Sequence, residues 1–94
     1  MRQFKVPIRK KVYTVRFVKR VDKRNSYGEC DYKNALIKVR LGDTKLEIAD
    51  TTLHELIHAC DRTLLEKQVV RITEALLVAL NKKEIRKILK TPQK

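Results

Sequence analysis

The residues best suited to chemistry in this chain are two histidines and a glutamate in the run His54-Glu55-Leu56-Ile57-His58. Side chains at positions i and i+4 of a helix share one face, so His54 and His58 can bind one zinc ion, each about 2.0–2.1 Å away. Glu55 is rotated by about 100° around the axis, which places it beside the metal and not among its ligands. There it can act as general base toward a zinc-activated water. This pattern on a helix is typical of zinc-dependent peptide hydrolysis.

A catalytic zinc site needs a third protein ligand, and the chain contains no histidine outside this run. Glu66 is the favoured candidate, because it lies near the core-facing seam of the next predicted helix and a short turn could bring it over the metal. Glu74, farther along that helix, is an alternative. Asp61 lies on the ligand face, but its position favours capping or the orientation of a ligand. Cys30 would have to reach the metal from a predicted hairpin.

Extended segments come before the histidine run. Residues 11–21 alternate between apolar and polar types and are rich in β-branched residues, which predicts a strand. A polar turn is expected at 22–26. Residues 27–32 and 35–41 flank Lys33-Asn34, which favours a hairpin whose second strand is half-buried.

Helical spacing follows from about residue 50 to the end. The first helix is expected to begin a little before Thr52, although Thr52 and Glu55 together spell a capping box. A second helix is predicted over about 65–81, and a short basic helix over 82–90 ends before Thr91-Pro92. The second helix is expected to turn one side to the core, formed by Val69, Ile72, Leu76 and Leu80.

Three further features bear on a site. If strand 35–41 is the edge of the sheet beside the histidine helix, its free backbone groups could pair with an extended peptide, and a plain core strand is an equal alternative. Tyr27 or Tyr32 could donate a hydrogen bond to a developing oxyanion, although ordinary packing is favoured for each. Cys60 is expected to be a small buried hydrophobic residue.

The charge of the chain is +12 and is concentrated at its ends. Residues 1–24 contain ten Lys and Arg against one acidic residue, and residues 82–94 contain six against one, whereas residues 25–81 have a charge of −2. Basic flanks of this kind are typical of contact with nucleic acid or another polyanion, and solvated surface charge is an equal alternative.

Length and composition limit the remaining possibilities. The 94 residues are expected to form one domain over 1–94, with a small core that a bound metal would help to stabilise. The absence of a long apolar run argues against a transmembrane helix, and no secretory signal is expected at the N-terminus. Two cysteines make no disulfide framework, so we expect reduced thiols and an intracellular protein.

The segment Thr52-Leu53-His54-Glu55-Leu56-Ile57-His58-Ala59 resembles the active-site helix of zincin-type metallopeptidases and is especially similar to the SprT-like group. The layout before this segment, with Gly28 at the start of a short strand and a second strand at 37–41, also resembles those minimal domains. Small phage and prophage metallopeptidase-like proteins share this compact arrangement. The resemblance covers roughly residues 26–80. SprT-like proteins take a third histidine from a downstream segment that this chain lacks, so a gluzincin-like pattern, with a glutamate from the next helix, fits better.

Together these features predict an α+β fold, minimal and zincin-like, in which a small antiparallel sheet of about three strands precedes two main helices and a short C-terminal one. The predicted function is that of a zinc metallopeptidase acting on a protein or peptide, with Glu55 as catalytic base and His54, His58 and Glu66 as zinc ligands. A basic nucleic-acid-binding module and an inactive zincin scaffold are the alternatives. No membrane partner is expected.

Overall fold

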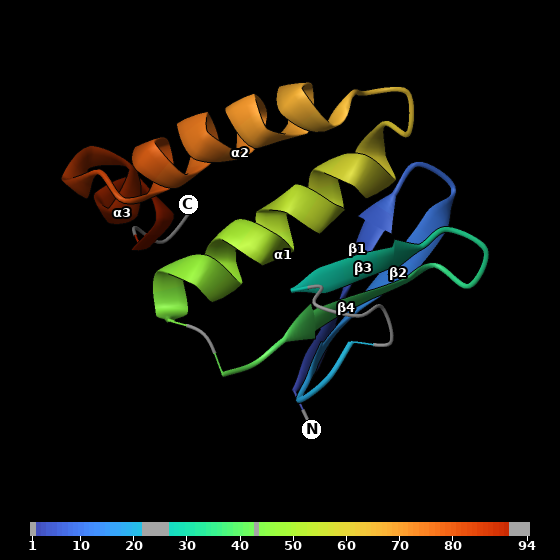
Figure 1. Cartoon of the computed structure of the whole chain (residues 1–94). Coiled ribbons are helices and arrows are strands. Elements are labelled where there is room, and N and C mark those ends of the chain that lie inside the picture. Colours follow the sequence, from blue (N-terminus) through green and yellow to red (C-terminus); the bar gives the residue numbers. More distant parts are fainter. Residues whose placement is uncertain (1, 22–26, 43, 91–94) are drawn as a thin grey trace.

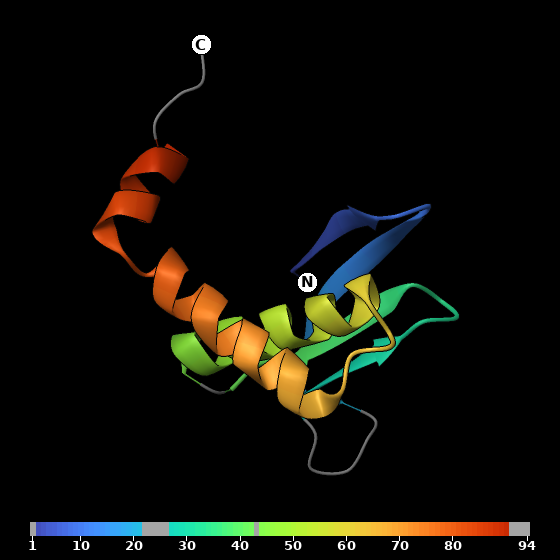
Figure 2. The ribbon, with the colours of Figure 1, turned by 90° about the horizontal axis from the view of Figure 1, so that it is seen from above.

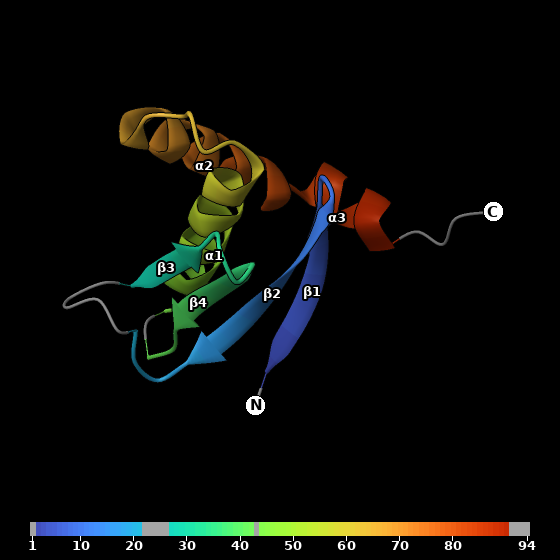
Figure 3. The ribbon, with the colours of Figure 1, turned by 90° about the vertical axis from the view of Figure 1, so that its right-hand side faces the viewer.

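The chain forms two layers, a four-stranded sheet and three helices that all lie on one face of it (Figures 1 and 3). The computed structural model describes residues 2–21, 27–42 and 44–90, so the turn expected at 22–26 and the helix stop at Thr91-Pro92 lie outside the described residues. This arrangement confirms the predicted α+β class. The elements are β1 (Gln3–Ile8), β2 (Lys11–Val18), β3 (Gly28–Asp31), β4 (Leu36–Arg40), α1 (Lys45–Cys60), α2 (Glu66–Leu80) and α3 (Lys83–Lys90).

The sheet has the strand order β1-β2-β4-β3 and is mixed. β1 pairs with β2 and β3 pairs with β4 in antiparallel fashion, but β2 and β4 run parallel. The sheet is thus mostly antiparallel, in agreement with the prediction of a small antiparallel sheet of about three strands, and it differs by one more strand and by the parallel pair β2–β4. Of the two roles expected for 35–41, the core strand is correct and the sheet edge is wrong, because β4 lies between β2 and β3. The edge beside α1 is β3.

Two tight turns set the register of the antiparallel pairs. Ile8 pairs with Lys11, so β1 and β2 are joined by two residues, the first of which, Arg9, has a φ of 57°. Positive φ at this position suits the twist of a two-residue hairpin. In the predicted β3–β4 hairpin, Asp31 Oδ1 accepts a hydrogen bond from the Asn34 backbone at 3.1 Å, and Asn34 Nδ2 donates to Asp31 Oδ2 at 2.8 Å.

The core lies between the sheet and α1. Val15, Ile37 and Val39 are fully buried at the centre of the sheet, and Ala59 of α1 joins the same cluster. Successive side chains of a strand point to opposite faces, and none of the described helices covers the other face of the sheet (Figure 3). Figure 3 shows that face turned away from all three helices.

α1 begins earlier than its histidine run suggests. Thr44 is the N-cap: its Oγ1 accepts a hydrogen bond from Glu47 N at 3.2 Å and donates to Glu47 Oε1 at 2.9 Å. The capping box that Thr52 and Glu55 spell is therefore not the start of the helix. Thr52 instead lies inside α1 and donates to the backbone oxygen of Ile48 at 2.7 Å. The early start places the histidines in the last two turns of a 16-residue helix.

α2 lies across α1, and the residues that it buries differ from those of its predicted apolar side. Val69 and Thr73 are its buried residues, and the Thr73 hydroxyl is satisfied by the Val69 backbone oxygen at 2.7 Å. Ile72, Leu76 and Leu80 are 38%, 40% and 42% exposed, so of the apolar side that these residues form with Val69 only Val69 is buried. α2 packs mainly on α1 and also contacts α3, and no described element covers its outer side (Figure 2).

Two smaller expectations concern the cysteines and the membrane. Both cysteines are free, but Cys60, the last residue of α1, is exposed and not buried as predicted, whereas its neighbour Ala59 is buried. Among the described residues, no helix is both long enough and apolar enough to span a membrane.

Candidate metal centre

The last turns of α1 place two imidazoles side by side. His54 and His58 are four residues apart, and their Nε2 atoms are 3.2 Å from each other. The rings meet edge to face, with centroids 4.8 Å apart and an interplanar angle of 67°. Each side chain is 21% exposed, so the pair opens to solvent while packing restrains the rings. The spacing read from the sequence therefore produces the expected shared face.

A short loop after α1 carries the third group back over this pair. Asp61 caps α1: its backbone N–H donates to Ile57 O at 3.0 Å, and its Oδ1 accepts from both the backbone and the hydroxyl of Thr63. Gln68 Oε1 then accepts a hydrogen bond from Leu65 N at 2.7 Å, which fixes the start of α2. Glu66 is the first residue of α2 and therefore lies directly above the end of α1.

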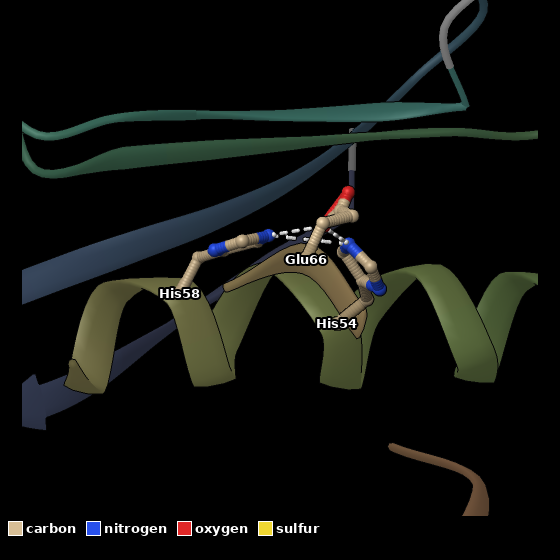
Figure 4. Close-up of side chains that lie close together, drawn as sticks. All are labelled: His54, His58 and Glu66. Atoms are coloured by element: carbon tan, nitrogen blue, oxygen red, sulfur yellow. Dashed lines mark hydrogen bonds and ion pairs between the residues drawn. The ribbon is translucent and has the colours of Figure 1, made fainter. Parts of the chain in front are cut away.

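The three side chains converge on a small triangle of ligand atoms (Figure 4). Glu66 Oε1 is 2.8 Å from the Nε2 atom of His54 and 2.8 Å from that of His58. Two ligands that bind zinc tetrahedrally at 2.0–2.1 Å lie about 3.3–3.4 Å apart. The separation between the two Nε2 atoms, 3.2 Å, is close to this value, and the two separations from Glu66 Oε1, 2.8 Å each, are about 0.5 Å shorter, a difference that rotation of the Glu66 side chain can supply. Two imidazole nitrogens and one carboxylate oxygen thus fit the ligand set of a catalytic zinc.

The electrostatics of Glu66 keep it ionised. Partial burial raises the pKa of its carboxyl group, but the hydrogen bond from His58 and the charge and hydrogen bond of His54 outweigh that effect, so the pKa is lowered overall. Its place in the first turn of α2 adds the favourable field of the helix N-terminus. The side chain is 67% exposed, so the carboxylate has room to rotate toward a cation.

Glu55 lies beside this triangle and does not belong to it. It lines a hollow of about 290 Å³ together with His54 and with Tyr27 and Gly28 at the start of β3. A candidate metal ligand, His54, and the carboxylate of Glu55 thus line the same hollow. This is the relation expected of a general base that would act on a water near a bound metal.

Gly28 is what lets α1 approach β3 so closely. A Cβ atom added there would lie 2.6 Å from Thr51 Cγ2, 3.1 Å from Lys38 O and 3.3 Å from Glu55 Cγ. Sequence reasoning did not assign a site role to Thr51 or to Asp50, which also line the hollow. A single glycine at the start of a strand is a signal for such a close approach.

The other candidate ligands lie apart from the triangle. Asp61 is occupied by the loop after α1, in the capping role that the sequence favoured, and the hydrogen bonds from Thr63 lower its pKa. Glu74 and Cys30 are not part of the cluster of ligand atoms found among the described residues. Each of the two tyrosines has its ring under an arginine, Tyr27 under Arg40 at 4.4 Å and Tyr32 under Arg62 at 4.1 Å, and Tyr27 also lines the hollow.

Comparison with known proteins adds no assignment. No protein-family model, no curated protein and no solved structure matches this chain. Function is therefore inferred from the residues and geometry of the site.

Proposed function

We propose that this chain is a zinc-dependent metallopeptidase in which His54, His58 and Glu66 hold the metal. The observation that carries the proposal is the convergence of one atom from each residue, 2.8–3.2 Å apart, although Glu66 comes from a different helix. Three protein ligands leave a fourth position open, as catalytic zinc requires. Both cysteines are free, so we propose that the enzyme works in a reducing, intracellular environment.

A bound zinc would supply Lewis-acid polarisation of the substrate carbonyl and acidify a water. In this proposal Glu55 accepts the proton of the attacking water and later donates it to the leaving amine. Tyr27 lines the same hollow and is the better placed of the two tyrosines to donate a hydrogen bond to a developing oxyanion.

The proposed substrate is an extended peptide that lies along β3. β3 is an edge strand of the described sheet, and Gly28 at its start borders the hollow that contains Glu55. Backbone pairing with such an edge would hold a peptide in an extended form beside the metal. This transfers to β3 the role that the sequence suggested for 35–41.

The first experiment measures bound zinc per chain by native mass spectrometry. Wild type is expected to carry about one zinc, and His58→Ala and Glu66→Ala none, because two remaining ligands hold the metal too weakly. Glu74→Ala is the matched control, since it removes a glutamate of the same helix outside the triangle, and it should retain the metal. A folded wild type without zinc would refute the proposed site.

The second experiment separates metal binding from chemistry. Glu55→Gln should retain about one zinc and lose peptidase activity on a denatured protein such as casein, because the amide cannot accept the proton of the attacking water. Asp50→Asn, which also changes a carboxylate lining the hollow, is the control and should cleave as wild type does. Equal activity of Glu55→Gln and wild type would exclude this mechanism and leave an inactive scaffold.

A second candidate function, nucleic-acid binding, is favoured by the uncovered face of the sheet. Arg16 of β2 pairs in register with Lys38 of β4, and neither side chain belongs to the buried face. Lys5 lies on the same outer face, because its register partner Thr14 is two residues from Arg16. Lys38 is paired with Glu29 of β3 at 3.8 Å, so the contact of this face with phosphates would depend mainly on Lys5 and Arg16.

This candidate is tested by fluorescence anisotropy with labelled DNA and RNA oligonucleotides over a range of salt concentrations. Binding should weaken steeply with salt, and Lys5→Glu should weaken it further, whereas Glu55→Gln should leave it unchanged. Binding that is independent of salt, or equal in wild type and Lys5→Glu, would contradict it.

A further inference from the structure

A large apolar groove runs along the side of α1 that faces away from the metal centre. It has a volume of about 890 Å³ and is bounded by α1, by β2 and the end of β4, and by the end of α2 and the start of α3. Figures 2 and 3 show α3 on the same side of α1 as β1 and β2. At 100° per residue, the α1 residues that line it, between Lys45 and Leu53, point on average away from His54 and His58, whereas Glu55 points between the two sides.

The floor of the groove is formed by aliphatic and aromatic side chains that solvent still reaches. Leu46 is 65% exposed and Leu80 is 42% exposed. Apolar side chains that stay in water do not gain the favourable free energy of burial. A contiguous apolar surface of this kind is typical of an interaction site. The principal floor residues are Phe17, Leu41, Leu46, Leu53, Leu77 and Leu80.

The rim of the groove carries charge of one sign only. Arg2, Lys45 and Arg86 border it from three different segments of the chain, and none of the described residues that line it is acidic. An occupant that complements both floor and rim must therefore be apolar on one side and anionic on the other.

We propose that this groove binds an acidic amphipathic helix of a partner protein. α1 lines the groove from Lys45 to Leu53, a rise of about 12 Å, which matches the spacing of apolar anchors at i, i+3, i+4 and i+7 on a docked helix. The acidic side of that helix faces the three cations of the rim. This binding does not depend on the metal centre, because the two surfaces use opposite sides of α1.

Charge decides against the other occupants. A second copy of this chain also has a charge of +12 and would bring cations against a cationic rim. A nucleic acid carries the required negative charge but offers phosphates and not aliphatic side chains to a leucine floor. An acidic helix satisfies the floor and the rim together.

The test uses the full chain and three synthetic peptides of about 16 residues. The first has leucines at i, i+3, i+4 and i+7 with glutamates on the other side. The second has lysine in place of each glutamate, and the third has serine in place of each leucine. Isothermal titration calorimetry should show binding of the first peptide, and at least about tenfold weaker binding of each of the other two.

Paired variants locate the binding to the groove. Leu80→Gln should weaken the acidic peptide about tenfold, whereas Val78→Gln, which changes an exposed residue of the same helix outside the groove, should not. Arg86→Glu should weaken it severalfold more than Lys90→Glu, although both change the net charge of α3 equally. Arg86→Glu and Lys90→Glu leave the apolar floor of the groove unchanged. Comparing these two variants therefore shows whether the peptide binds in the groove, even if the Leu80→Gln protein does not fold.

Four outcomes would overturn the proposal. These are no binding of the acidic peptide, equal binding of the serine peptide, equal effects of Arg86→Glu and Lys90→Glu, and a dimer in sedimentation experiments that Leu80→Gln dissociates. The second and third outcomes would show nonspecific attraction to a basic protein, and the last would identify the groove as a self-association surface.

Discussion

Gly28→Ala tests the close approach of α1 to β3 on which the proposed site depends. The added methyl would lie 2.6 Å from Thr51 Cγ2, about 1 Å inside normal carbon–carbon contact, and 3.1 Å from the backbone oxygen of Lys38. Because the second contact is with backbone of the neighbouring strand, the strain cannot be relieved by side-chain rotation alone. The contact with Thr51 requires α1 to move away from β3, and the contact with Lys38 O requires a small shift between β3 and β4.

The expected effect follows from these contacts. Overpacking of this kind costs about 1–3 kcal/mol, and replacing glycine reduces the entropy of the unfolded chain, which returns about 0.4–1 kcal/mol. The net loss of unfolding free energy is then about 1–2 kcal/mol, or a fall in Tm of roughly 4–15 °C for a domain of this size. Thermal unfolding followed by circular dichroism measures it.

Two further variants show whether the mechanism is the predicted one. Thr51→Ser removes the Cγ2 atom at 2.6 Å, so it should recover about 1 kcal/mol in the Gly28→Ala background and slightly destabilise wild type. Gly42→Ala is the control: at φ +104° it is strained by conformation, with nothing within 4 Å of the new Cβ, so Thr51→Ser should not rescue it. A Gly28→Ala protein as stable as wild type, or one that Thr51→Ser does not rescue, would refute the reasoning.

Three other predictions concern the cap, a thiol and the metal. Thr44→Ala removes the N-cap acceptor of Glu47 N and should lower the unfolding free energy by about 1 kcal/mol in urea titrations; no change in midpoint would contradict this. Burial, with the charges of Glu55 and Asp31, raises the pKa of the Cys30 thiol to about 11. In a Cys60→Ser background, iodoacetamide should therefore modify Cys30 about 100-fold more slowly at pH 8 than a free thiol, and the rate should rise toward pH 11. A rate that does not depend on pH would exclude the raised pKa as the cause. Zinc at about 100 times its Kd should stabilise wild type by about 2.7 kcal/mol against chelator-treated protein, and leave the Tm of His58→Ala unchanged.

The parts of the fold that the sequence predicts well are those encoded locally. The spacing of His54 and His58 needs only a helix to bring their rings together, and α1 provides it. The alternation in 11–21 and 35–41 similarly predicts β2 and β4, because each strand buries one face against α1. These predictions depend on neighbours within a few residues.

Features that depend on distant neighbours were harder to predict. The sequence of 35–41 does not show whether β2 or solvent lies beside this strand. The central position of β4 and its parallel pairing with β2 therefore could not be predicted from the segment. β1 was missed because Gln3–Ile8 contains a proline and has mainly exposed residues, as an edge strand tolerates. Its pairing comes from the tight turn at Arg9, whose sequence carries no glycine or asparagine signal.

The third ligand shows the same limit within the site. Glu66 and Glu74 are both glutamates of the second helix, and sequence spacing alone did not exclude either. The difference is made by the loop between α1 and α2, where Asp61 turns the chain and Gln68 fixes the first turn of α2. Glu66 is thereby returned to the end of α1, while Glu74 is carried two turns farther along the helix.

α1 connects these features, because it is the element that packs against both the sheet and α2. The proposed metal centre and the proposed helix-binding groove lie on its opposite sides, and each ligand would bind the folded chain only. Each should therefore raise the unfolding free energy by its own binding term, and the two increments should add if α1 behaves as a rigid rod. A domain of this size is stable by only about 5–15 kcal/mol, so increments of 2–3 kcal/mol are easily measured. A departure from additivity would therefore mean that α1 transmits occupancy of one side to the other.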